Sequence, residues 1–356
     1  MKRTIALLVA LATFLSVSAQ MRFVEAADLT ITGKALPTEH PYHRIDTTRY
    51  KGFTPVENQQ VRFPAGLAIA FSTNSPRLDI HATYRCERSA DNTPGISNAG
   101  FDLYIRRGNE WVYAASHAPK QRGKPFTLIT GMDSTWKECL LYLPIMSELD
   151  SLRIGVVEQA SIRASETPFR HKIVIFGSSF THGVSTSRAG MSYPMQIARN
   201  TGLGFCNIAC SGNCKLQSYF ADYLGDVADA DAMVFDAFSN PDARMIEERL
   251  IPFIERIRAK LPRTPLIFVQ TIRREGTNFN LRFREREDAK REAARRMMAL
   301  ATARFNDVYF IDRDDLTGSD HMTSVDGTHP SDLGYWRWAQ ALQPELLRIL
   351  EQYGIR

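Results

Sequence analysis

The chain has 356 residues, of which 44% are hydrophobic and 23% charged, and its formal net charge is +5. This length allows two domains, and the composition is that of an ordinary soluble globular protein rather than a disordered or fibrous one. Because the net charge is small and the two signs are interspersed, the composition offers no basic stripe for nucleic acid, and we expect no nucleic-acid partner.

The first residues have the features of a secretory signal peptide. Lys2 and Arg3 precede an apolar run at residues 5–17, which ends in small residues. This is the order of charged region, apolar region and cleavage site in such signals. The apolar run is shorter than the roughly 20 residues that span a bilayer, so a membrane anchor is the less favoured alternative. We predict a signal peptide at residues 1–19, a periplasmic or secreted protein, and no membrane insertion after signal cleavage.

Five cysteines leave the disulfide question open. Their number is odd, so at least one thiol has no partner within the chain, while one bridge would be compatible with export. Cys206, Cys210 and Cys214 recur every four residues, but the stretch passes from an apolar run into a Ser-Gly-Asn loop, so the thiols need not converge on a metal. We interpret them as small buried residues and predict no metal site.

The N-terminal part of the chain has the pattern of a β-rich domain. Short apolar runs separated by turn residues place apolar side chains at every second position, as in strands with one buried face. The runs are residues 61–63, 67–71, 78–84, 101–105, 111–114, 139–143 and 152–157. Many short strands at this spacing predict an antiparallel β-sandwich, which we assign to residues 26–165.

After about Thr167 the rhythm changes to alternating strands and helices. Expected strands are residues 172–176, 205–208, 232–236, 266–270 and 308–311, and helix-length segments are 193–200, 215–224, 245–260, 284–305 and 331–352. This alternation predicts an α/β domain at residues 168–356 with a parallel sheet covered on both faces. The charge-dense run Arg284–Arg296 carries both signs, so we interpret it as a solvated helix face.

Polar residues follow the predicted strands where a catalytic site would be expected. The first strand of the α/β unit leads into Gly177-Ser178-Ser179-Phe180-Thr181-His182-Gly183. Loops at the carboxyl ends of parallel strands bind ligands. Near the other end of the chain, Asp326 and His329 lie three apart before the last helix. A histidine can accept the proton of a serine while a carboxylate orients its ring. Taken singly, each of these residues also fits a turn, a cap or a surface position.

Two further polar segments, residues 209–213 and 236–241, lie between the serine loop and Asp326 in the sequence. Each of them follows a predicted strand. With these four blocks the second half of the chain resembles the SGNH hydrolases, a family whose blocks are named for Ser, Gly, Asn and His. The resemblance implies a flavodoxin-like three-layer domain. It also implies hydrolysis of carboxylic esters through an acyl-serine intermediate, without metal or organic cofactor.

The resemblance implies roles for five residues. The nucleophile maps to Ser179, and the final D-x-x-H maps to Asp326 and His329. The glycine block maps to Gly212 and the asparagine block to Asn240. In the family, backbone N–H groups of the first two blocks and the asparagine side chain form the oxyanion hole. That role is therefore implied for Ser179, Gly212 and Asn240.

The blocks depart from the usual pattern in a way that resembles a two-domain subgroup. Ser178 stands where the first block usually has aspartate, and Ser239 precedes Asn240 where a plain G-x-N-D is absent. The subgroup has a first block of the form G-S-S-x-T-x-G and a β-rich N-terminal domain with a G-x-D-L-Y signature, here residues 100–104. We interpret Asp102 of this signature as structural rather than catalytic.

Alternatives remain for two of these roles. Ser178 is the rival nucleophile, and Asn213 competes with Asn240 as oxyanion donor. His182 is too close to Ser179 along the loop, and lacks a nearby carboxylate, to be the base.

We therefore predict an exported serine esterase whose partner is an acylated carbohydrate, most simply an O-acetyl ester, or another small ester. A lipid or thioester acylhydrolase is the alternative enzyme. A catalytically inactive carbohydrate-binding protein on a hydrolase scaffold is the alternative of another class. All the mapped site residues follow Thr167. We therefore expect the N-terminal domain to bind substrate or to form one wall of the cleft.

Overall fold

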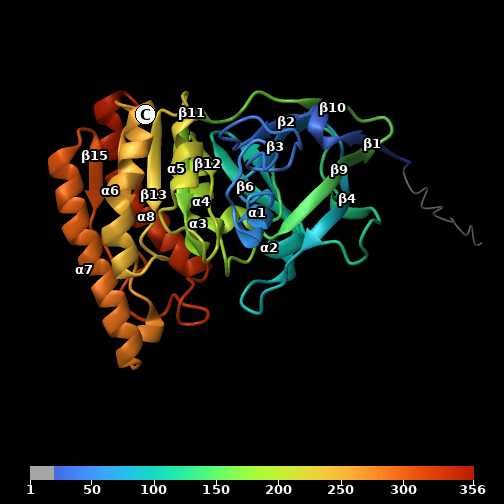
Figure 1. The fold of residues 1–356 in the computed structure, drawn as a ribbon. Coiled ribbons are helices and arrows are strands. Elements are labelled where there is room, and N and C mark those ends of the chain that lie inside the picture. The colour runs from blue at the N-terminus through green and yellow to red at the C-terminus, as the bar shows by residue number, and fades with distance from the viewer. Residues whose placement is uncertain (1–19) are drawn as a thin grey trace, which may run out of the picture.

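The computed structural model describes residues 20–356, so the predicted signal peptide at residues 1–19 lies outside the described part. A β-sandwich formed by the N-terminal part of the chain lies beside a C-terminal α/β unit (Figure 1). Both architectures agree with the fold predicted from the sequence. No helix in the part of the chain that is described has the length and apolar character needed to cross a membrane.

The sandwich consists of two antiparallel sheets. The first has the order β1-β9-β4-β7: β1 Met21–Glu25, β9 Ser147–Val157, β4 Arg77–Glu87 and β7 Phe126–Thr130. The second has the order β10-β3-β8-β5-β6, with β2 also paired to β3: β10 Ile162–Ala164, β3 Ala68–Thr73, β8 Lys137–Tyr142, β5 Phe101–Arg107, β6 Glu110–His117 and β2 Thr30–Thr32. The sandwich begins with β1 at Met21, five residues before the start that we predicted.

One expected strand of the sandwich is wrong. Residues 61–63 form a turn after helix α1 (Pro55–Gln60). Pro55 occupies the first helical position, and Thr54 and Glu57 cap the helix reciprocally, which favours a helix start over a strand. The other short helices of this half are η1 (Ala26–Asp28) and α2 (Gly95–Ala99).

The α/β unit is built on a parallel sheet of the order β12-β11-β13-β14-β15. Its strands are β11 Arg170–Gly177, β12 Leu203–Asn207, β13 Ala232–Asp236, β14 Leu266–Val269 and β15 Val308–Ile311. Its helices are α3 Ser179–His182, α4 Tyr193–Thr201, α5 Ser218–Gly225, α6 Ala243–Lys260, α7 Leu281–Arg304 and α8 Asp332–Leu350. Short 3₁₀ turns are η2 Ala189–Met191, η3 Glu275–Thr277 and η4 Glu351–Tyr353. The strand order reverses at β11, and ligands bind at such switch points.

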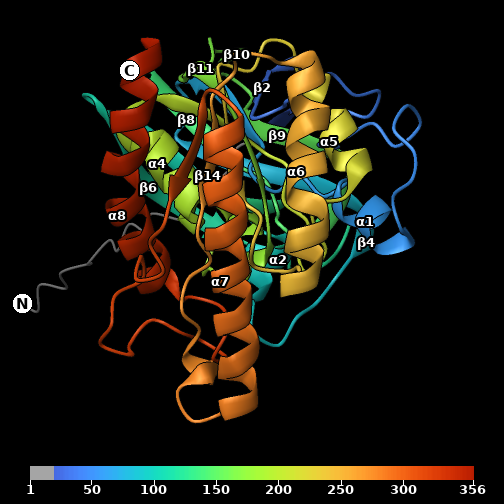
Figure 2. The same cartoon turned by 60° about the vertical axis from the view of Figure 1, so that its left-hand side comes forward.

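Alternate residues of the parallel strands face opposite layers. In β11, Val174 and Phe176 pack with helices α5, α6 and α7, whereas Ile173 and Ile175 pack with α4 and α8. Figure 2 shows α6 and α7 side by side on the first face. The sheet is therefore buried on both faces, as the continuous apolar strands predicted.

The charge-dense run of α7 is not simply a solvated face. Glu287, Lys290 and Arg291 are buried. Glu287 accepts hydrogen bonds from Lys290 (2.7 Å) and from Arg274 (3.3 Å). Our interpretation as a solvated face is wrong at these positions. The negative charge of Glu287 is compensated inside the protein by Lys290, three residues further along the helix, and by Arg274 on a neighbouring loop.

The two domains share a hydrophobic core. On the sheet that contains β3, β5 and β8, Phe71 and Leu141 face the sandwich interior, whereas Ala70, Tyr104 and Tyr142 face the α/β unit. These residues belong to one apolar cluster with the buried side chains of α4 and α8. A buried interface of this kind favours one fixed arrangement of the domains.

Arg44 joins the N-terminal domain to the segment that follows β12. Its guanidinium is fully buried and donates to the carbonyl oxygens of Gln60 (2.6 Å), Phe63 (2.6 Å), Asn207 (3.1 Å) and Ala209 (2.9 Å). Burial lowers the pKa of Arg44 to about 10. These hydrogen bonds compensate the buried charge and fix the backbone that leads to Gly212.

The G-x-D-L-Y signature also lies at the interface. Asp102 is buried, accepts the N–H of Gly190 (2.9 Å) and forms an ion pair with Arg188 (3.2 Å). The Arg199 guanidinium stacks on the Tyr104 ring, 4.0 Å from its centroid. A side chain at position 190 would come within 2.7 Å of Asp102, so glycine permits this close approach. The contacts agree with a structural role for Asp102.

The cysteine thiols of residues 20–356 form no disulfide. Cys206 and Cys214 direct their Sγ atoms to different carbonyl oxygens, those of Lys34 (3.2 Å) and Asp236 (3.7 Å). Four of the five thiols are buried. The spacing of every four residues therefore does not bring the thiols to one point.

Candidate active site

The segment after β11 places Ser179 at the carboxyl edge of the sheet. The strand ends at Gly177, and Ser178 caps helix α3 by accepting the N–H of Phe180 (3.1 Å). A Cβ at position 177 would lie 2.1 Å from the Thr181 hydroxyl, so only glycine allows the helix to begin so close to the strand. Ser179 is therefore the first residue of α3, and its N–H has no acceptor within that helix.

The loop before α8 is held by the carboxylate of Asp326. Its Oδ1 accepts the N–H groups of Thr328 (2.9 Å) and His329 (2.7 Å). Gly327 has φ +82°, a left-handed conformation that closes this turn. The turn brings the carboxylate and imidazole of residues 326 and 329 together, as the three-residue spacing predicted.

The three residues mapped to a triad form one chain of hydrogen bonds. His329 Nδ1 lies 2.8 Å from Asp326 Oδ2, and His329 Nε2 lies 2.9 Å from Ser179 Oγ. A proton on Nδ1 satisfies the carboxylate and leaves Nε2 to accept the serine hydroxyl. The Phe180 ring packs edge-on against the imidazole, with centroids 5.8 Å apart. The arrangement has the geometry of a nucleophile, a base and an orienting carboxylate.

The carboxylate of Asp326 is held in its ionised form. Partial burial opposes ionisation, but hydrogen bonds from the His329 backbone and side chain, from Asn92 and from Thr328 outweigh it and hold the pKa of Asp326 well below its usual range. The group therefore remains a hydrogen-bond acceptor for His329 throughout the neutral range.

The glycine and asparagine blocks meet beside the serine loop. Gly212 adopts φ +74° after β12, and Asn240 follows β13. The N–H of Cys214 donates to Asn240 Oδ1 (3.2 Å), which fixes the orientation of this amide and leaves its Nδ2 without a partner among the described residues. The Asn213 amide instead donates to its neighbour Ser211 (2.8 Å). This difference favours Asn240 over Asn213 as a donor to a ligand.

Two other polar residues of the serine loop are engaged elsewhere. The hydroxyl of Ser178 donates to Asp236 (2.7 Å), and both residues are buried. His182 is also buried and donates from Nε2 to the carbonyl of Ile145 (2.6 Å). Burial lowers the pKa of His182 to about 3. Neither side chain is available as the reacting group in this geometry.

The loop that carries Asn240 is anchored from beneath by charged groups. The carbonyl oxygen of Ser239 accepts from Arg274 (2.8 Å) and from Lys290 (3.0 Å). The Arg274 guanidinium also lies 5.5 Å from the centre of the Phe180 ring. Arg274 of the loop after β14 and Lys290 of α7 thus hold the asparagine block in place next to the serine loop.

One side chain of the N-terminal domain reaches this site, which sequence analysis missed. Asn92 Nδ2 donates to Asp326 Oδ2 (2.7 Å) and lies 3.2 Å from His329 Nδ1. Thr93 fixes the Asn92 amide by donating to its Oδ1 (3.1 Å), and Thr93 itself accepts the N–H of Ser185 (3.0 Å). In the sequence, Asp91-Asn92-Thr93-Pro94 is indistinguishable from an ordinary turn.

Family models match both parts of the chain. The model of the GDSL-like lipase/acylhydrolase family matches residues 170–347. The model of the N-terminus of SGNH hydrolase-type esterases matches residues 21–162. No curated protein matches the chain.

Solved structures resemble the chain over four fifths of its length or more. A protein of Bacteroides ovatus described as a GDSL-like lipase has 39% identity and a TM-score of 0.90, with 93% of this chain and 98% of that chain covered. A salicylyl-acyltransferase of a tetracycline biosynthetic pathway has 16% identity and a TM-score of 0.74, covering 94% and 99%. A family two carbohydrate esterase of Clostridium thermocellum, solved with cellohexaose, has 15% identity and a TM-score of 0.59, covering 81% and 93%.

Replacing Asn92 by alanine should lower kcat for p-nitrophenyl acetate about tenfold, since a hydrogen bond to a charged group contributes about 1.5–3 kcal/mol. The KM should change little, because Asn92 contacts Asp326 and His329 rather than Ser179 or the proposed oxyanion donors. Asn92→Asp should be more severe, since it places a second negative charge beside Asp326. Unchanged kcat in Asn92→Ala, with the melting temperature of the unmodified protein, would contradict a functional role for this contact.

Proposed function

Because the chain belongs to the GDSL-like lipase/acylhydrolase family, we propose that it is an exported serine esterase that removes O-acetyl groups from a carbohydrate. The main support for the proposal is the chain of hydrogen bonds that runs from Asp326 through His329 to Ser179. The residue pattern at positions 1–19 supports export. The shared fold with a carbohydrate esterase makes sugar esters the first substrate class to test.

In the proposed reaction, Ser179 Oγ attacks the ester carbonyl while His329 Nε2 takes its proton. The imidazolium that forms is stabilised by the ionised Asp326. Collapse of the tetrahedral intermediate releases the sugar hydroxyl, which receives the proton from His329. Water, activated by the same histidine, then attacks the acetyl-serine and releases acetate and free Ser179.

The negative charge on the carbonyl oxygen would be stabilised by three N–H groups. These are the backbone N–H of Ser179, the backbone N–H of Gly212 and the Nδ2 of Asn240. Support comes from the first-turn position of Ser179 and from the anchored Oδ1 of Asn240. Donors fixed in advance contribute more to catalysis than donors that must reorganise.

A lipid or thioester acylhydrolase is a second candidate, favoured by apolar side chains near the histidine loop. Phe279 is 98% exposed and Met322 is 69% exposed. The loops that carry them meet where the N–H of Gly276 donates to the carbonyl of Gly327 (2.7 Å), next to Asp326. Comparison of p-nitrophenyl esters separates the two candidates: kcat/KM that rises from acetate to octanoate would favour the lipid enzyme, and a maximum at acetate favours the sugar esterase.

Replacing Ser179 by alanine should reduce kcat for p-nitrophenyl acetate by about 10⁴ or more, which is typical for loss of a triad nucleophile. Ser178→Ala is the matched control on the adjacent residue. It removes the hydrogen bond to buried Asp236 and should therefore lower the melting temperature. Hydrolysis of p-nitrophenyl acetate through the acyl-enzyme should remain measurable in this variant. An inactive Ser178→Ala and an active Ser179→Ala would show that the nucleophile is misassigned.

Replacing Asn240 by alanine should lower kcat by roughly 10²–10³, the usual effect of losing one oxyanion donor. The KM should remain nearly the same, because the donor binds the transition state more strongly than the ground state. Asn213→Ala serves as the comparison, and we expect a much smaller loss because its amide is bound to Ser211. The reverse order of the two effects would assign the donor role to Asn213.

A further inference from the structure

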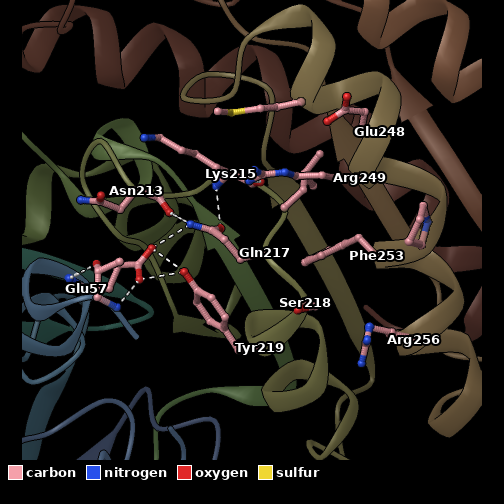
Figure 3. A pocket seen from close by; sticks show the side chains of 14 residues that line it. Glu57, Asn213, Lys215, Gln217, Ser218, Tyr219, Glu248, Arg249, Phe253 and Arg256 are labelled. Carbon is pink, nitrogen blue, oxygen red and sulfur yellow. Dashed lines mark hydrogen bonds between the residues drawn. The ribbon is translucent and has the colours of Figure 1, made fainter. Parts of the chain in front are cut away.

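A cavity of about 580 Å³ lies between α1 of the N-terminal domain and helices α5 and α6. Figure 3 shows Glu57 and Tyr219 on one side and Arg249, Phe253 and Arg256 of α6 on the other. The volume falls within the range of pockets that hold small ligands. The pocket is therefore large enough for part of a substrate.

One wall of the pocket is formed by the segment that follows Gly212, a proposed oxyanion donor. This wall includes Asn213 and Lys215, which come one and three positions after Gly212 in the chain. The hydrogen bond from the Cys214 N–H to Asn240 ties the same segment to the asparagine block. A substrate whose carbonyl oxygen lies at Gly212 and Asn240 can thus extend along this loop into the pocket.

Two cations of the pocket are not neutralised by neighbouring carboxylates. Within residues 20–356, Lys215 and Arg249 form no ion pair, and the guanidinium of Arg249 donates only to the carbonyl of Lys215 (3.1 Å). In contrast, two other arginines of α6 are paired, Arg244 with Glu248 (2.6 Å) and Arg256 with Asp222 (3.1 Å). The pocket therefore has unpaired positive charge beside the segment that follows Gly212.

The carboxylate of Glu57 does not serve as the missing partner. It is buried and accepts hydrogen bonds from the Thr54 N–H (2.8 Å), the Gln217 amide (2.8 Å) and the Tyr219 hydroxyl (2.8 Å). These contacts tie α1 to the start of α5 and shape the pocket wall (Figure 3). The N-terminal domain thus contributes to the pocket without cancelling the charge of Lys215 and Arg249.

We propose that this pocket is a substrate subsite that binds a negatively charged sugar unit of the acylated glycan through Lys215 and Arg249. The proposal rests on the proposed esterase function. A carboxylate or sulfate group provides oxygens for charge-assisted hydrogen bonds with both side chains. Such a unit, next to the acylated one, would make acidic polysaccharides the preferred substrates over neutral ones.

Direct binding tests the subsite independently of catalysis. Calorimetry with the full mature protein compares trigalacturonate, a sulfated galactose disaccharide and neutral xylotriose, none of which carries an ester. We expect at least one of the two anionic sugars to bind, and the pair of them distinguishes carboxylate from sulfate. Binding should weaken in about 0.5 M sodium chloride, which screens the charges. Equal binding of xylotriose, or no binding of either anionic sugar, would overturn the proposal.

Charge variants identify the responsible residues. Lys215→Gln and Arg249→Gln should each weaken binding of the anionic sugar about tenfold, the effect of losing a hydrogen bond between charged groups. Arg249→Lys keeps the charge and should retain most of the affinity. Arg304→Gln, which removes an arginine of α7 paired with Glu255 away from the pocket lining, controls for the loss of one positive charge and should bind normally. Equal weakening in all the glutamine variants would overturn the assignment to these two residues.

Binding of the anionic sugars and hydrolysis of p-nitrophenyl acetate distinguish failure of the subsite proposal from failure of the proposed esterase function. If the protein binds trigalacturonate but does not hydrolyse p-nitrophenyl acetate, the subsite stands and the esterase proposal fails. If it hydrolyses the ester but binds neither anionic sugar, the esterase proposal stands and the subsite fails.

Discussion

The hydrogen bond between Ser179 Oγ and His329 Nε2, 2.9 Å long, joins residues 150 positions apart in the chain. It requires that the loop after strand β11 and the loop before the last helix α8 be held in fixed relation. Two contacts of α8 serve this purpose: Asp332 accepts the N–H of Ser187 (2.9 Å), and Tyr335 donates to the carbonyl of Val184 (2.7 Å). The packed face of α8 and the serine loop therefore position the two reacting groups together.

A buried carboxylate at the neighbouring strand supports the serine loop. Asp236 pairs in register with Gly177 and accepts the Ser178 N–H (3.2 Å), the Ser178 hydroxyl (2.7 Å) and the Thr181 hydroxyl (2.9 Å). Burial raises the pKa of Asp236 to about 6 despite these hydrogen bonds. The strand register thus provides an acidic group close to Ser178, the position where the resembled family usually has aspartate. The N-terminal domain supports the remaining loops through Arg44 and Asn92.

Much of this architecture follows from local sequence patterns. Apolar side chains at every second position predicted the sandwich, and the alternation of apolar runs with helix-length segments predicted the parallel sheet. The D-x-x-H spacing placed Asp326 and His329 on one turn, because the carboxylate can accept N–H groups two and three residues further on.

The contacts that the sequence patterns missed are made between residues far apart in the chain. Asn92 and Asp326 are 234 positions apart, and no local feature marks their contact. The burial of Glu287 in helix α7 likewise depends on its contact with Arg274, which lies on a loop outside that helix. The periodicity of the helix contains no information about this contact.

Covalent labelling of the nucleophile tests the central claim most directly. An alkyl fluorophosphonate reacts when the serine Oγ forms a bond to phosphorus and fluoride leaves, so the label marks the activated hydroxyl. Peptide mapping of the labelled protein by mass spectrometry should locate a single adduct on Ser179, and His329→Ala should slow its formation. An adduct on Ser178, or a folded protein that takes up no label, would contradict the assignment of Ser179, His329 and Asp326 as a working triad.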